Sequence, residues 1–560
     1  MAARSIRLRP WQKLALERLT TTESPDFLTV ATPGAGKTTF ALTAARQEMA
    51  SRQGSRLVVV APTQHLKVQW AENASRFDLY LEPMWSPADG LPGDFHGVVT
   101  TYQQVANDPE PFRSLSRDGV VVLDEIHHAA DERAWGGGVR RAFELAGRRI
   151  GLSGTPFRSD TQAIPFVNYR LDEAVPDFEY GYKEALADGG VVRPVFFPRL
   201  NGHMEWVAPD GQMLSHTFDD ALGRVKSNQR LRTALSLDGE WMPAVIRQGH
   251  ALLADLRRTQ ANAAGLVIAT DQDHARGIAD MFERRFRVRP TLALSDEKDS
   301  SERIARFAES QEPWIVAVRM VSEGVDIPRL RVGVYATTTT TELFFRQAVG
   351  RLVRWNGPLR RQRAYMLIPD DSRLRTYSQQ IADHRRHSLR KPAEDGLEPP
   401  PEAGPQQEDP TALDDLGDDE QLSLFAAVSA TPLDDEADRS VFDPDHPDDI
   451  EWNPPPDDQL ADLELPLAPL PPLAGAGRGS AGSPIDVRTR RKELREENSR
   501  IVAELALVTG WTHGKVNAEL NRLTKVKKVT EATVEQLEAR RDQGERWLER
   551  ARYRLRRAAR

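Results

Sequence analysis

The chain has 560 residues, a net charge of −8 and no cysteine. This length is too great for a single hydrophobic core, so roughly two to four domains are expected. The lack of cysteine excludes disulfides, cysteine-ligated zinc and iron–sulfur clusters. Residues 1–10 have no apolar core of signal-peptide length, and no run approaches the roughly 20 apolar residues of a membrane span. We therefore expect a soluble protein of the cytoplasm.

The first patterned segment is Leu8-Arg9-Pro10-Trp11-Gln12, which precedes a helix-like stretch at residues 13–19. Pro10 suits the first turn of a helix, because its missing N–H would have no intrahelical partner there. Taken alone, the segment is as consistent with an ordinary helix start as with part of a ligand site.

A phosphate-binding loop is predicted next. Residues 27–30 form an apolar run typical of a buried strand, and residues 39–49 are free of Gly and Pro, which favours a helix. Between them lies Ala31-Thr32-Pro33-Gly34-Ala35-Gly36-Lys37-Thr38. The glycines let backbone N–H groups approach phosphate oxygens, and the helix N-terminus adds a positive dipole. Lys37 is expected to reach the β- and γ-phosphates, and the Thr38 hydroxyl to hold Mg²⁺.

Hydroxyl residues end the next two predicted strands. The apolar runs at 57–61 and 98–102 favour central parallel strands, and Thr63, Thr100 and Thr101 lie at their carboxyl ends. Ligands of open α/β sheets bind beyond those ends, so the three threonines are candidate donors to a nucleic-acid backbone. Capping of the following helices explains them equally well.

A pair of carboxylates follows a further apolar strand at residues 120–123. Asp124 and Glu125 at the end of a buried strand are costly unless a cation lies near them, and the Mg²⁺ at the phosphate loop supplies one. We expect Asp124 to bind that metal and Glu125 to orient and deprotonate the attacking water. Zinc ligation by His127 and His128 is a poor alternative, because adjacent residues rarely share one metal and no further ligands are evident.

A strand and turn at residues 150–158 carry Ser153 and Thr155. Small hydroxyl residues at such a place change hydrogen-bond partners at little steric cost. From residue 201 to 262 the pattern loosens, which favours a connector or insertion. Trp206 within it is interpreted as a core residue, with stacking on a base as the alternative.

A second α/β unit is predicted from residue 263 onward. It shows strands at 265–269, 291–294, 314–318 and 332–335 and helices at 271–286 and 301–310. It ends in Gln347-x-x-Gly-Arg351-x-x-Arg354. Arg351 and Arg354 are predicted to share a helix face, where their mutual repulsion requires an anion. A γ-phosphate held by the first unit is that anion, which makes both candidate arginine fingers; a surface salt-bridge face is the alternative.

The motifs in their order resemble one family. They are L-R-P-W-Q, A-x-x-G-x-G-K-T, D-E-I-H, S-G-T-P, S-E-G-V-D-I-P and Q-x-x-G-R-x-x-R, and they span residues 8–369. The set is similar to the superfamily 2 DExH-box helicases and translocases near the XPB-like and type III restriction-enzyme branch, and to DEAD/DEAH-box helicases of actinobacteria and their phages. The resemblance implies an α/β fold of two tandem RecA-like domains with ATP and Mg²⁺ in their cleft.

The resemblance also assigns site residues. It implies that Gln12 makes a bidentate amide contact to adenine, supported by Arg9, and that His127 couples the ATP site to Ser153 and Thr155. It implies that the catalytic residues are Lys37, Asp124, Glu125, Gln347, Arg351 and Arg354. It implies that the nucleotide is held by Thr32, Pro33, Gly34, Ala35, Gly36, Lys37, Thr38, Thr39, Gly324 and Asp326.

The tail changes composition at residue 391. Residues 391–485 are dominated by Pro, Leu, Asp and Glu, so they cannot bury enough apolar surface to offset chain entropy, and a disordered linker is predicted. Within it, Gln421-Leu422-Ser423-Leu424-Phe425 is similar to the peptide by which bacterial proteins dock on the replicative sliding clamp. Two leucines and a phenylalanine suit an apolar groove. A chance match of five residues is the alternative.

The last segment, residues 486–560, is basic and helical in pattern. Helices are expected at 490–507 and 515–523, and Thr530 is expected to cap a final helix. Lysines and arginines on such helices suit phosphate contacts, so a small all-α module that binds nucleic acid is predicted. A charged, solvated helix face is the alternative.

These patterns define an expected domain order. It is an ATP-binding domain at 1–200, a connector at 201–262, a second RecA-like domain at 263–390, the linker at 391–485 and the helical module at 486–560. The expected function is that of an ATP-dependent DNA helicase or translocase. An RNA helicase is the second hypothesis, and a clamp-tethered scaffold or defence protein whose ATPase is a conformational switch is the third.

Overall fold

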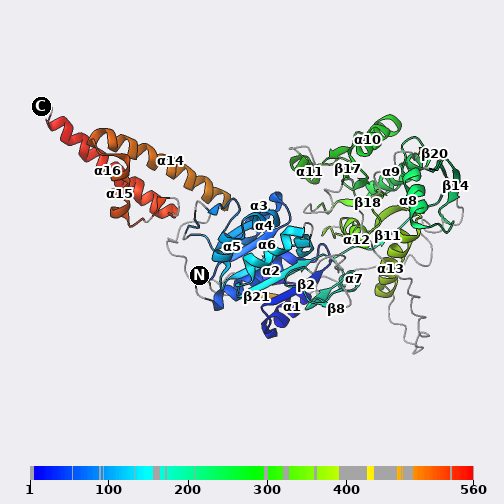
Figure 1. Cartoon of the computed structure of the whole chain (residues 1–560), viewed down its shortest axis with the longest axis horizontal. Coiled ribbons are helices and arrows are strands. Elements are labelled where there is room, and N and C mark those ends of the chain that lie inside the picture. The colour runs from blue at the N-terminus through cyan, green and yellow to red at the C-terminus, as the bar shows by residue number, and fades with distance from the viewer. Residues whose placement is uncertain are drawn as a thin grey trace.

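The computed structural model describes residues 5–52, 54–87, 90–92, 94–130, 133–154, 164–170, 173–208, 210–294, 300–318, 327–357, 362–389, 426–433, 463–467, 470, 484–526, 528–529 and 532–558. Figure 1 shows two α/β units side by side and a group of C-terminal helices beyond the first of them. None of the described helices combines the length and the apolar character that a membrane crossing requires.

The first unit is built on a seven-stranded parallel sheet with the order β10–β2–β7–β6–β3–β5–β4. Its inner strands are apolar runs buried on both faces, as parallel sheets require. In chain order the strands are β2 (Asp26–Ala31), β3 (Leu57–Ala61), β4 (Leu81–Glu82), β5 (Gly97–Thr101), β6 (Val120–Leu123), β7 (Arg148–Ser153) and β10 (Phe178–Tyr180). A separate antiparallel pair is formed by β8 (Tyr169–Arg170) and β9 (Glu173–Ala174).

Helices cover both faces of this sheet. One face carries α1 (Pro10–Thr21), α2 (Lys37–Ser51), α3 (Gln64–Ser75) and α7 (Tyr182–Asp188). The other carries α4 (Tyr102–Asn107), α5 (Pro109–Ser116) and α6 (Arg133–Phe143), and a short 3-10 helix, Ile126–Ala130, follows β6. Phe27 of β2 packs in the cluster beneath α1, α2, α3 and α7, and Leu28 packs in the cluster beneath α4, α5 and α6. Successive side chains of the strand therefore point to opposite faces of the sheet.

The second unit is a further parallel sheet with the order β11–β19–β18–β15–β17–β16, and β12 also pairs with β19. Its strands are β11 (Val195–Phe196), β12 (Arg199–Leu200), β15 (Ala264–Ala269), β16 (Thr291–Ala293), β17 (Trp314–Val318), β18 (Leu330–Ala336) and β19 (Ala364–Pro369). Its helices are α9 (Trp241–Thr259), α10 (Gln272–Phe286), α11 (Ser300–Glu309), α12 (Glu342–Gly350) and α13 (Ser372–Leu389). The two sheets have the repeated strand–helix connections that the apolar runs predicted.

The chain crosses from the first unit to the second at residues 191–195. Val192 forms an isolated bridge with Arg354, and β11 and β12 already belong to the second sheet, so the crossing precedes residue 200. Arg193 is buried there and donates hydrogen bonds to backbone carbonyl groups of Pro328, Leu330 and Arg354. Its guanidinium therefore ties the crossing segment to the second unit.

An accessory antiparallel sheet, β14–β13–β20, packs with α8 (Arg224–Ala234) against the second unit. Its strands are β13 (Gly202–Val207), β14 (Met213–Thr217) and β20 (Ala426–Pro432). Trp206 of β13 is fully buried and its indole donates to Gln229 at 3.0 Å. The interpretation of Trp206 as a core residue is therefore confirmed.

Two segments of the acidic stretch are strands, which corrects the prediction that residues 391–485 are disordered throughout. β20 pairs with β13, and β21 (Leu463–Pro466) pairs antiparallel with β1 (Ser5–Leu8). Leu465 of β21 and the following Leu467 and Leu470 also pack against the core of the first unit. Local composition does not reveal these strands, because their partners lie far away in the chain.

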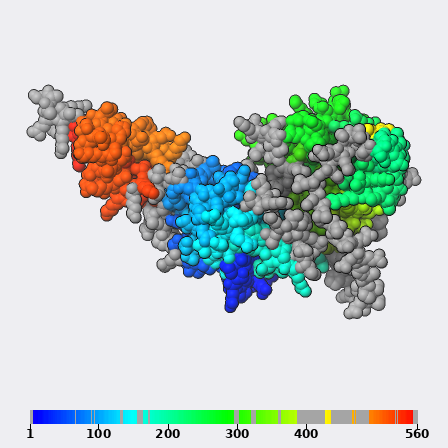
Figure 2. Space-filling view, in the orientation of Figure 1, coloured from blue at the N-terminus to red at the C-terminus, as the bar shows by residue number. Residues whose placement is uncertain are grey.

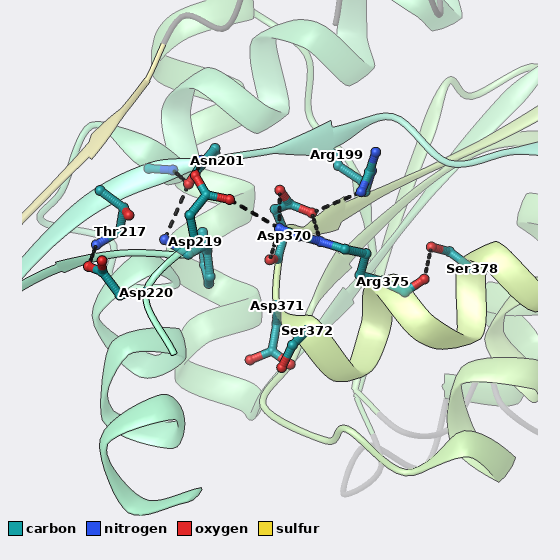
Figure 3. A network of polar contacts seen from close by, with 12 residues as sticks. Arg199, Asn201, Thr217, Asp219, Asp220, Asp370, Asp371, Ser372, Arg375 and Ser378 are labelled. Atoms are coloured by element: carbon teal, nitrogen blue, oxygen red, sulfur yellow. Dashed lines mark hydrogen bonds and ion pairs between the residues drawn. The ribbon is translucent and has the colours of Figure 1, made fainter. Parts of the chain in front are cut away.

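A polar network fixes the accessory sheet to the second unit (Figure 3). Arg375 in the first turn of α13 donates to Asp370 at 2.7 Å and to Asp219 at 3.4 Å. Arg199 of β12 reaches the same Asp370 at 3.5 Å, and Asn201 donates to Asp219 at 2.5 Å. Because these contacts join β12, α13 and the segment after β14, the accessory sheet is held as part of the second unit.

The described part of the C-terminal segment forms helices α14 (Pro484–Thr509), α15 (His513–Thr524) and α16 (Val534–Ala558), in keeping with the predicted all-α module. Arg540 of α16 is buried between them and donates to three asparagines, Asn498, Asn517 and Asn521. The prediction that Thr530 caps the last helix is wrong. That residue lies outside the described ranges, and the hydroxyl of Thr533 accepts the N–H of Gln536 at 3.2 Å.

The module docks on the β4 edge of the first sheet. Arg491 of α14 pairs with Glu82 of β4 at 3.7 Å, and its guanidinium lies 5.6 Å from the centre of the Phe95 ring. The backbone N–H of Val534 donates to Asp94 at 3.2 Å. Figure 2 shows the rest of the module as a lobe that projects beyond the first unit.

Candidate active site

The phosphate loop connects β2 to α2 at the carboxyl edge of the first sheet. Gly34 and Gly36 have left-handed backbone angles, with φ of +84° and +95°, which glycine adopts at little cost. The start of α1 braces the loop, because the Trp11 indole donates to the Ala35 carbonyl oxygen at 3.1 Å. Arg9 donates to the carbonyl oxygens of Gly34 and Ala35, both at 3.3 Å. These contacts within the chain hold the loop in shape.

Gln12 is engaged within the chain. Its Nε2 donates to the Gly36 carbonyl oxygen at 2.9 Å, its Oε1 accepts the N–H of Arg9 at 2.8 Å, and the residue is 2 % exposed. In this conformation Gln12 and Arg9 brace the phosphate loop, and the amide expected to contact adenine has both its groups bonded to backbone. Trp11, which the sequence motif includes but to which no role was assigned, also stacks on Tyr180, with the ring centres 5.1 Å apart.

Lys37, Glu125 and Gly154 converge from three motifs. The Nζ of Lys37 lies 3.1 Å from Oε1 of Glu125, and Oε2 of Glu125 accepts the N–H of Gly154 at 2.9 Å. Glu125 has a φ of +46°, a conformation that a residue with a Cβ adopts only at a cost. This backbone turn directly after β6 places the carboxylate against both the loop and the end of β7.

The two adjacent carboxyl groups have opposite pKa shifts. Burial alone would raise the pKa of Glu125, but the charges of Lys37 and His127 and the N–H of Gly154 outweigh it and lower the pKa. Burial and the charge of Glu125 together raise the pKa of Asp124. The lowered pKa favours the ionised form of Glu125, which can orient a water, whereas the raised pKa of Asp124 belongs to a carboxyl whose charged form a nearby cation would stabilise.

Asp124 is held by two aromatic side chains that the motifs did not identify. Trp70 of α3 donates from Nε1 to Oδ2 of Asp124 at 2.8 Å, and the Tyr102 hydroxyl donates to the Asp124 carbonyl oxygen at 2.9 Å. The only sequence signal for either is general: a buried indole or phenol needs a hydrogen-bond acceptor.

The two residues predicted to hold Mg²⁺ have side chains whose donor chemistry suits that ion. Thr38 supplies a hydroxyl in the first turn of α2 and Asp124 a carboxylate after β6, and Mg²⁺ prefers hard oxygen ligands together with substrate phosphates. The raised pKa of Asp124 reflects a carboxyl crowded by burial and by Glu125, and a divalent cation would relieve both effects.

His127 links the carboxylates to the second unit. Its Nδ1 lies 3.4 Å from the Ser153 hydroxyl and 3.7 Å from Oε2 of Glu125, and its Nε2 lies 3.2 Å from Nε2 of Gln347. The predicted coupling pair of His127 and Ser153 is therefore in contact. Gln347 extends that contact from the first unit to α12 of the second.

Arg351 and Arg354 do not share a helix face, which corrects that part of the prediction. α12 ends at Gly350, Arg351 is its C-cap, and Arg354 lies beyond the helix in the bridge with Val192. The motif has helical spacing, but the helix ends at Gly350 and the residues after it run to the bridge between Arg354 and Val192 of the crossing segment.

The end of α12 nevertheless touches the phosphate loop. A Cβ placed on Gly350 would lie 2.7 Å from Cγ of Pro33, so glycine permits the close approach of the two units. A Cβ placed on Gly34 would lie 3.5 Å from Cγ of Arg354. Arg354 therefore lies against the loop that is expected to bind the nucleotide phosphates.

Other predicted residues have different positions. Thr100 and Thr101 are buried, Thr100 bonds to Gln104 at 3.2 Å, and the Thr101 hydroxyl accepts the N–H of Gln104 at 3.3 Å as the cap of α4. Thr63 occupies the N-cap position of α3. For Thr101, the alternative that its hydroxyl caps the following helix is therefore confirmed. The predicted sites that lie outside the described residues are Thr155, Gly324, Asp326 and the peptide Gln421, Leu422, Ser423, Leu424 and Phe425.

A cavity of about 510 Å³ lies in the cleft between the units. The first unit lines it with Thr32 and Pro33 of the loop and with Gly154, and the second unit with Arg346 and Gly350. Its volume falls within the range of small-molecule and cofactor pockets. The cleft beside the phosphate loop therefore has room for a ligand contacted by both units.

Two sequence families match the chain. The family described as "Type III restriction enzyme, res subunit" matches residues 5–158, which carry the phosphate loop and the carboxylates. The family described as "Helicase conserved C-terminal domain" matches residues 249–356, which end in the Gln347–Arg354 motif. With the two parallel sheets, these matches confirm the predicted α/β fold of two RecA-like domains.

Mycobacterial proteins match this chain over almost all of its residues. The chain is 38 % identical to an uncharacterized protein of Mycobacterium leprae, with 96 % of this chain and 93 % of the relative covered. It is 37 % identical to an uncharacterized protein of Mycobacterium tuberculosis H37Rv, with 96 % and 92 % covered. It is also 23 % identical to the DNA 3′–5′ translocase XPB2 of Sulfurisphaera tokodaii, with 57 % of this chain and 73 % of that protein covered.

Solved structures align with about two thirds of the chain. A fragment of a putative HsdR subunit of a type I restriction enzyme from Vibrio vulnificus has a TM-score of 0.47 at 18 % identity, with 66 % of this chain and 65 % of that chain covered. Dbp5 of S. cerevisiae bound to RNA and ADP BeF3 has a TM-score of 0.42 at 14 % identity, with 67 % and 87 % covered.

Proposed function

This chain belongs to the superfamily 2 helicases, and from that premise we propose that it is an ATP-dependent DNA translocase or helicase. One observation carries the proposal: the carboxylate that pairs with Lys37 is joined, through His127, to Gln347 of the other unit. A chain of contacts that spans the cleft can convert the state of a bound nucleotide into relative motion of the two units.

The proposed reaction is ATP hydrolysis. The γ-phosphate draws Lys37 away from Glu125, and the freed carboxylate orients a water and accepts its proton. The water oxygen attacks the γ-phosphorus while the bond to the bridging oxygen breaks, which gives ADP and phosphate. Mg²⁺ held by Thr38 and Asp124 would supply neutralisation of the phosphate charge. Arg354 stabilises the negative charge that grows in the transition state.

His127 is the proposed coupling residue. Its two ring nitrogens face Glu125 and Gln347, so a change at the γ-phosphate that moves Glu125 also changes the contact with α12. ATP binding closes the two units on a strand, and hydrolysis reopens them one step further along. The close approach of Gly350 to Pro33 across the cleft is a contact that this closure would make or strengthen.

DNA is the proposed track, because the relative XPB2 is a DNA 3′–5′ translocase by its name and the C-terminal helices are rich in arginine and lysine. Steady-state ATP turnover measured alone, with single-stranded DNA, with duplex DNA and with RNA tests the choice. We expect DNA to stimulate turnover several-fold more than RNA. Greater stimulation by RNA would make RNA the track, and turnover that no nucleic acid stimulates would favour a conformational switch.

The C-terminal helices are proposed to contact DNA phosphates. Arg500 of α14 and Arg546 and Arg550 of α16 are exposed. Replacing all three with glutamine should weaken DNA binding and lower the slope of log affinity against log salt by roughly three, because each phosphate contact releases condensed counterions. Fluorescence anisotropy at several salt concentrations measures both. Glu496→Gln, at an exposed position of α14, is the matched control, and an unchanged slope in the triple variant would assign the module another partner.

The peptide Gln421–Phe425 is proposed to bind a bacterial sliding clamp. It directly precedes β20, which anchors the chain to the accessory sheet. Leu424→Ala with Phe425→Ala should abolish binding of purified clamp in a calorimetric titration and leave ATP turnover on free DNA unchanged, because the apolar side chains supply the contact. Leu413→Ala with Leu416→Ala is the matched control. Absent binding by the wild type, or equal binding by the variant, would show that the peptide has no such role.

A further inference from the structure

Asp124 is fixed at both its side chain and its backbone. The indole of Trp70 holds Oδ2 at 2.8 Å and the Tyr102 hydroxyl holds the carbonyl oxygen at 2.9 Å. Trp70 is 3 % exposed and Tyr102 is 0 % exposed, so water does not compete for either bond. With Oδ2 held in this way, the orientation of the whole carboxylate is set by Trp70.

The two aromatic residues belong to helices that start at the carboxyl edge of the sheet. α3 follows Thr63 and α4 follows Thr101. Buried Lys67 of α3 donates to Gln104 of α4 at 3.0 Å, which locks the helices together. A displacement at the start of either helix therefore reaches Asp124 through short, buried contacts, without passing through the phosphate loop.

We propose that Trp70 is a positioning residue for the metal-binding carboxylate Asp124, and that it transmits displacement of α3 to the nucleotide site. The inference rests on the proposed function and deepens it. A carboxylate that binds a metal through one oxygen is directed by the hydrogen bond to the other, and loss of such an outer contact typically weakens metal binding. α3 begins at the edge where open α/β sheets bind ligands. A nucleic-acid strand bound at that edge displaces α3, and Trp70 passes the displacement to Asp124.

The test replaces the donor and keeps an aromatic ring. Trp70→Phe removes the indole N–H, and the matched control is Trp206→Phe, which removes an equally buried indole bonded to Gln229 at 3.0 Å in the accessory sheet. The affinity for Mn²⁺ is measured by electron paramagnetic resonance with a non-hydrolysable ATP analogue bound. We expect Trp70→Phe to weaken Mn²⁺ binding about tenfold and Trp206→Phe to leave it unchanged.

Activity separates positioning from packing. In Trp70→Phe we expect kcat for ATP to fall about tenfold, analogue affinity without metal to stay unchanged, and the stimulation of turnover by DNA to decrease. Tyr102→Phe, which removes the second contact to Asp124, should lower Mn²⁺ affinity in the same direction, and it serves as the test if thermal unfolding shows that Trp70→Phe does not fold.

Several outcomes would overturn the inference. Mn²⁺ affinity in a folded Trp70→Phe equal to that of Trp206→Phe would remove the positioning role. Weakened Mn²⁺ binding with an unchanged stimulation by DNA would remove the transmission role. A wild-type protein that hydrolyses no ATP would contradict the proposed function instead, and the Mn²⁺ measurement with bound analogue would still decide the role of Trp70.

Discussion

Lys37→Ala is expected to lower kcat for ATP by about 100-fold or more while the protein stays folded. In the proposed site Lys37 is the cation that the phosphate loop directs toward the γ-phosphate, and its Nζ lies 3.1 Å from Oε1 of Glu125. Its removal takes away the counterion of the γ-phosphate and the ion-pair partner that positions Glu125. Steady-state phosphate release at saturating ATP and DNA measures the effect.

The matched control for this substitution is Lys13→Ala. Lys13 lies on α1, and its ammonium makes a long, exposed contact of 3.7 Å with Glu17, so its removal should change neither turnover nor unfolding temperature noticeably. Wild-type turnover in a folded Lys37→Ala protein would show that the loop is not the phosphate site.

Arg354→Ala is expected to lower kcat by roughly 10³-fold or more and to change ATP affinity little, because an arginine finger acts on charge that develops in the transition state. Arg354 comes from the second unit and lies over Gly34 of the phosphate loop. Single-turnover hydrolysis, with nucleotide binding measured separately by calorimetry, distinguishes the two effects.

A surface arginine gives the comparison for this variant. Arg276 on α10 forms an exposed pair with Asp273 at 3.2 Å, and Arg276→Ala should behave as the wild type. If Arg354→Ala retained its kcat, or lost ATP binding in proportion to kcat, Arg354 would be a binding or structural residue and another side chain would supply the transition-state charge.

The arrangement of residues at the proposed nucleotide site could be predicted from the sequence, because these residues lie in short, local patterns. The strand, glycine-rich turn and helix around Lys37 are contiguous, and Asp124 and Glu125 follow their strand directly. Apolar runs predict parallel strands, and parallel strands bring their carboxyl ends to one edge. The convergence of Lys37, Glu125 and Gly154 follows from that geometry.

Contacts between distant segments escape the same reasoning. Trp70 and Trp11 lie at ordinary helix positions, and only the fold reveals that their indoles bond Asp124 and the phosphate loop. Strands β20 and β21 lie in a stretch whose composition predicts disorder, and they exist because distant edge strands accept them. Arg354 leaves its predicted helix because the crossing segment pairs with it.

Movement along DNA is measured most directly by the displacement of streptavidin from the end of a biotinylated single strand. The wild-type protein should displace it with ATP and fail with a non-hydrolysable analogue, and Lys37→Ala should fail with either. A wild-type protein that hydrolyses ATP in the presence of DNA, yet leaves streptavidin bound at both the 5′ and the 3′ end, would contradict the proposal that this chain is a DNA translocase.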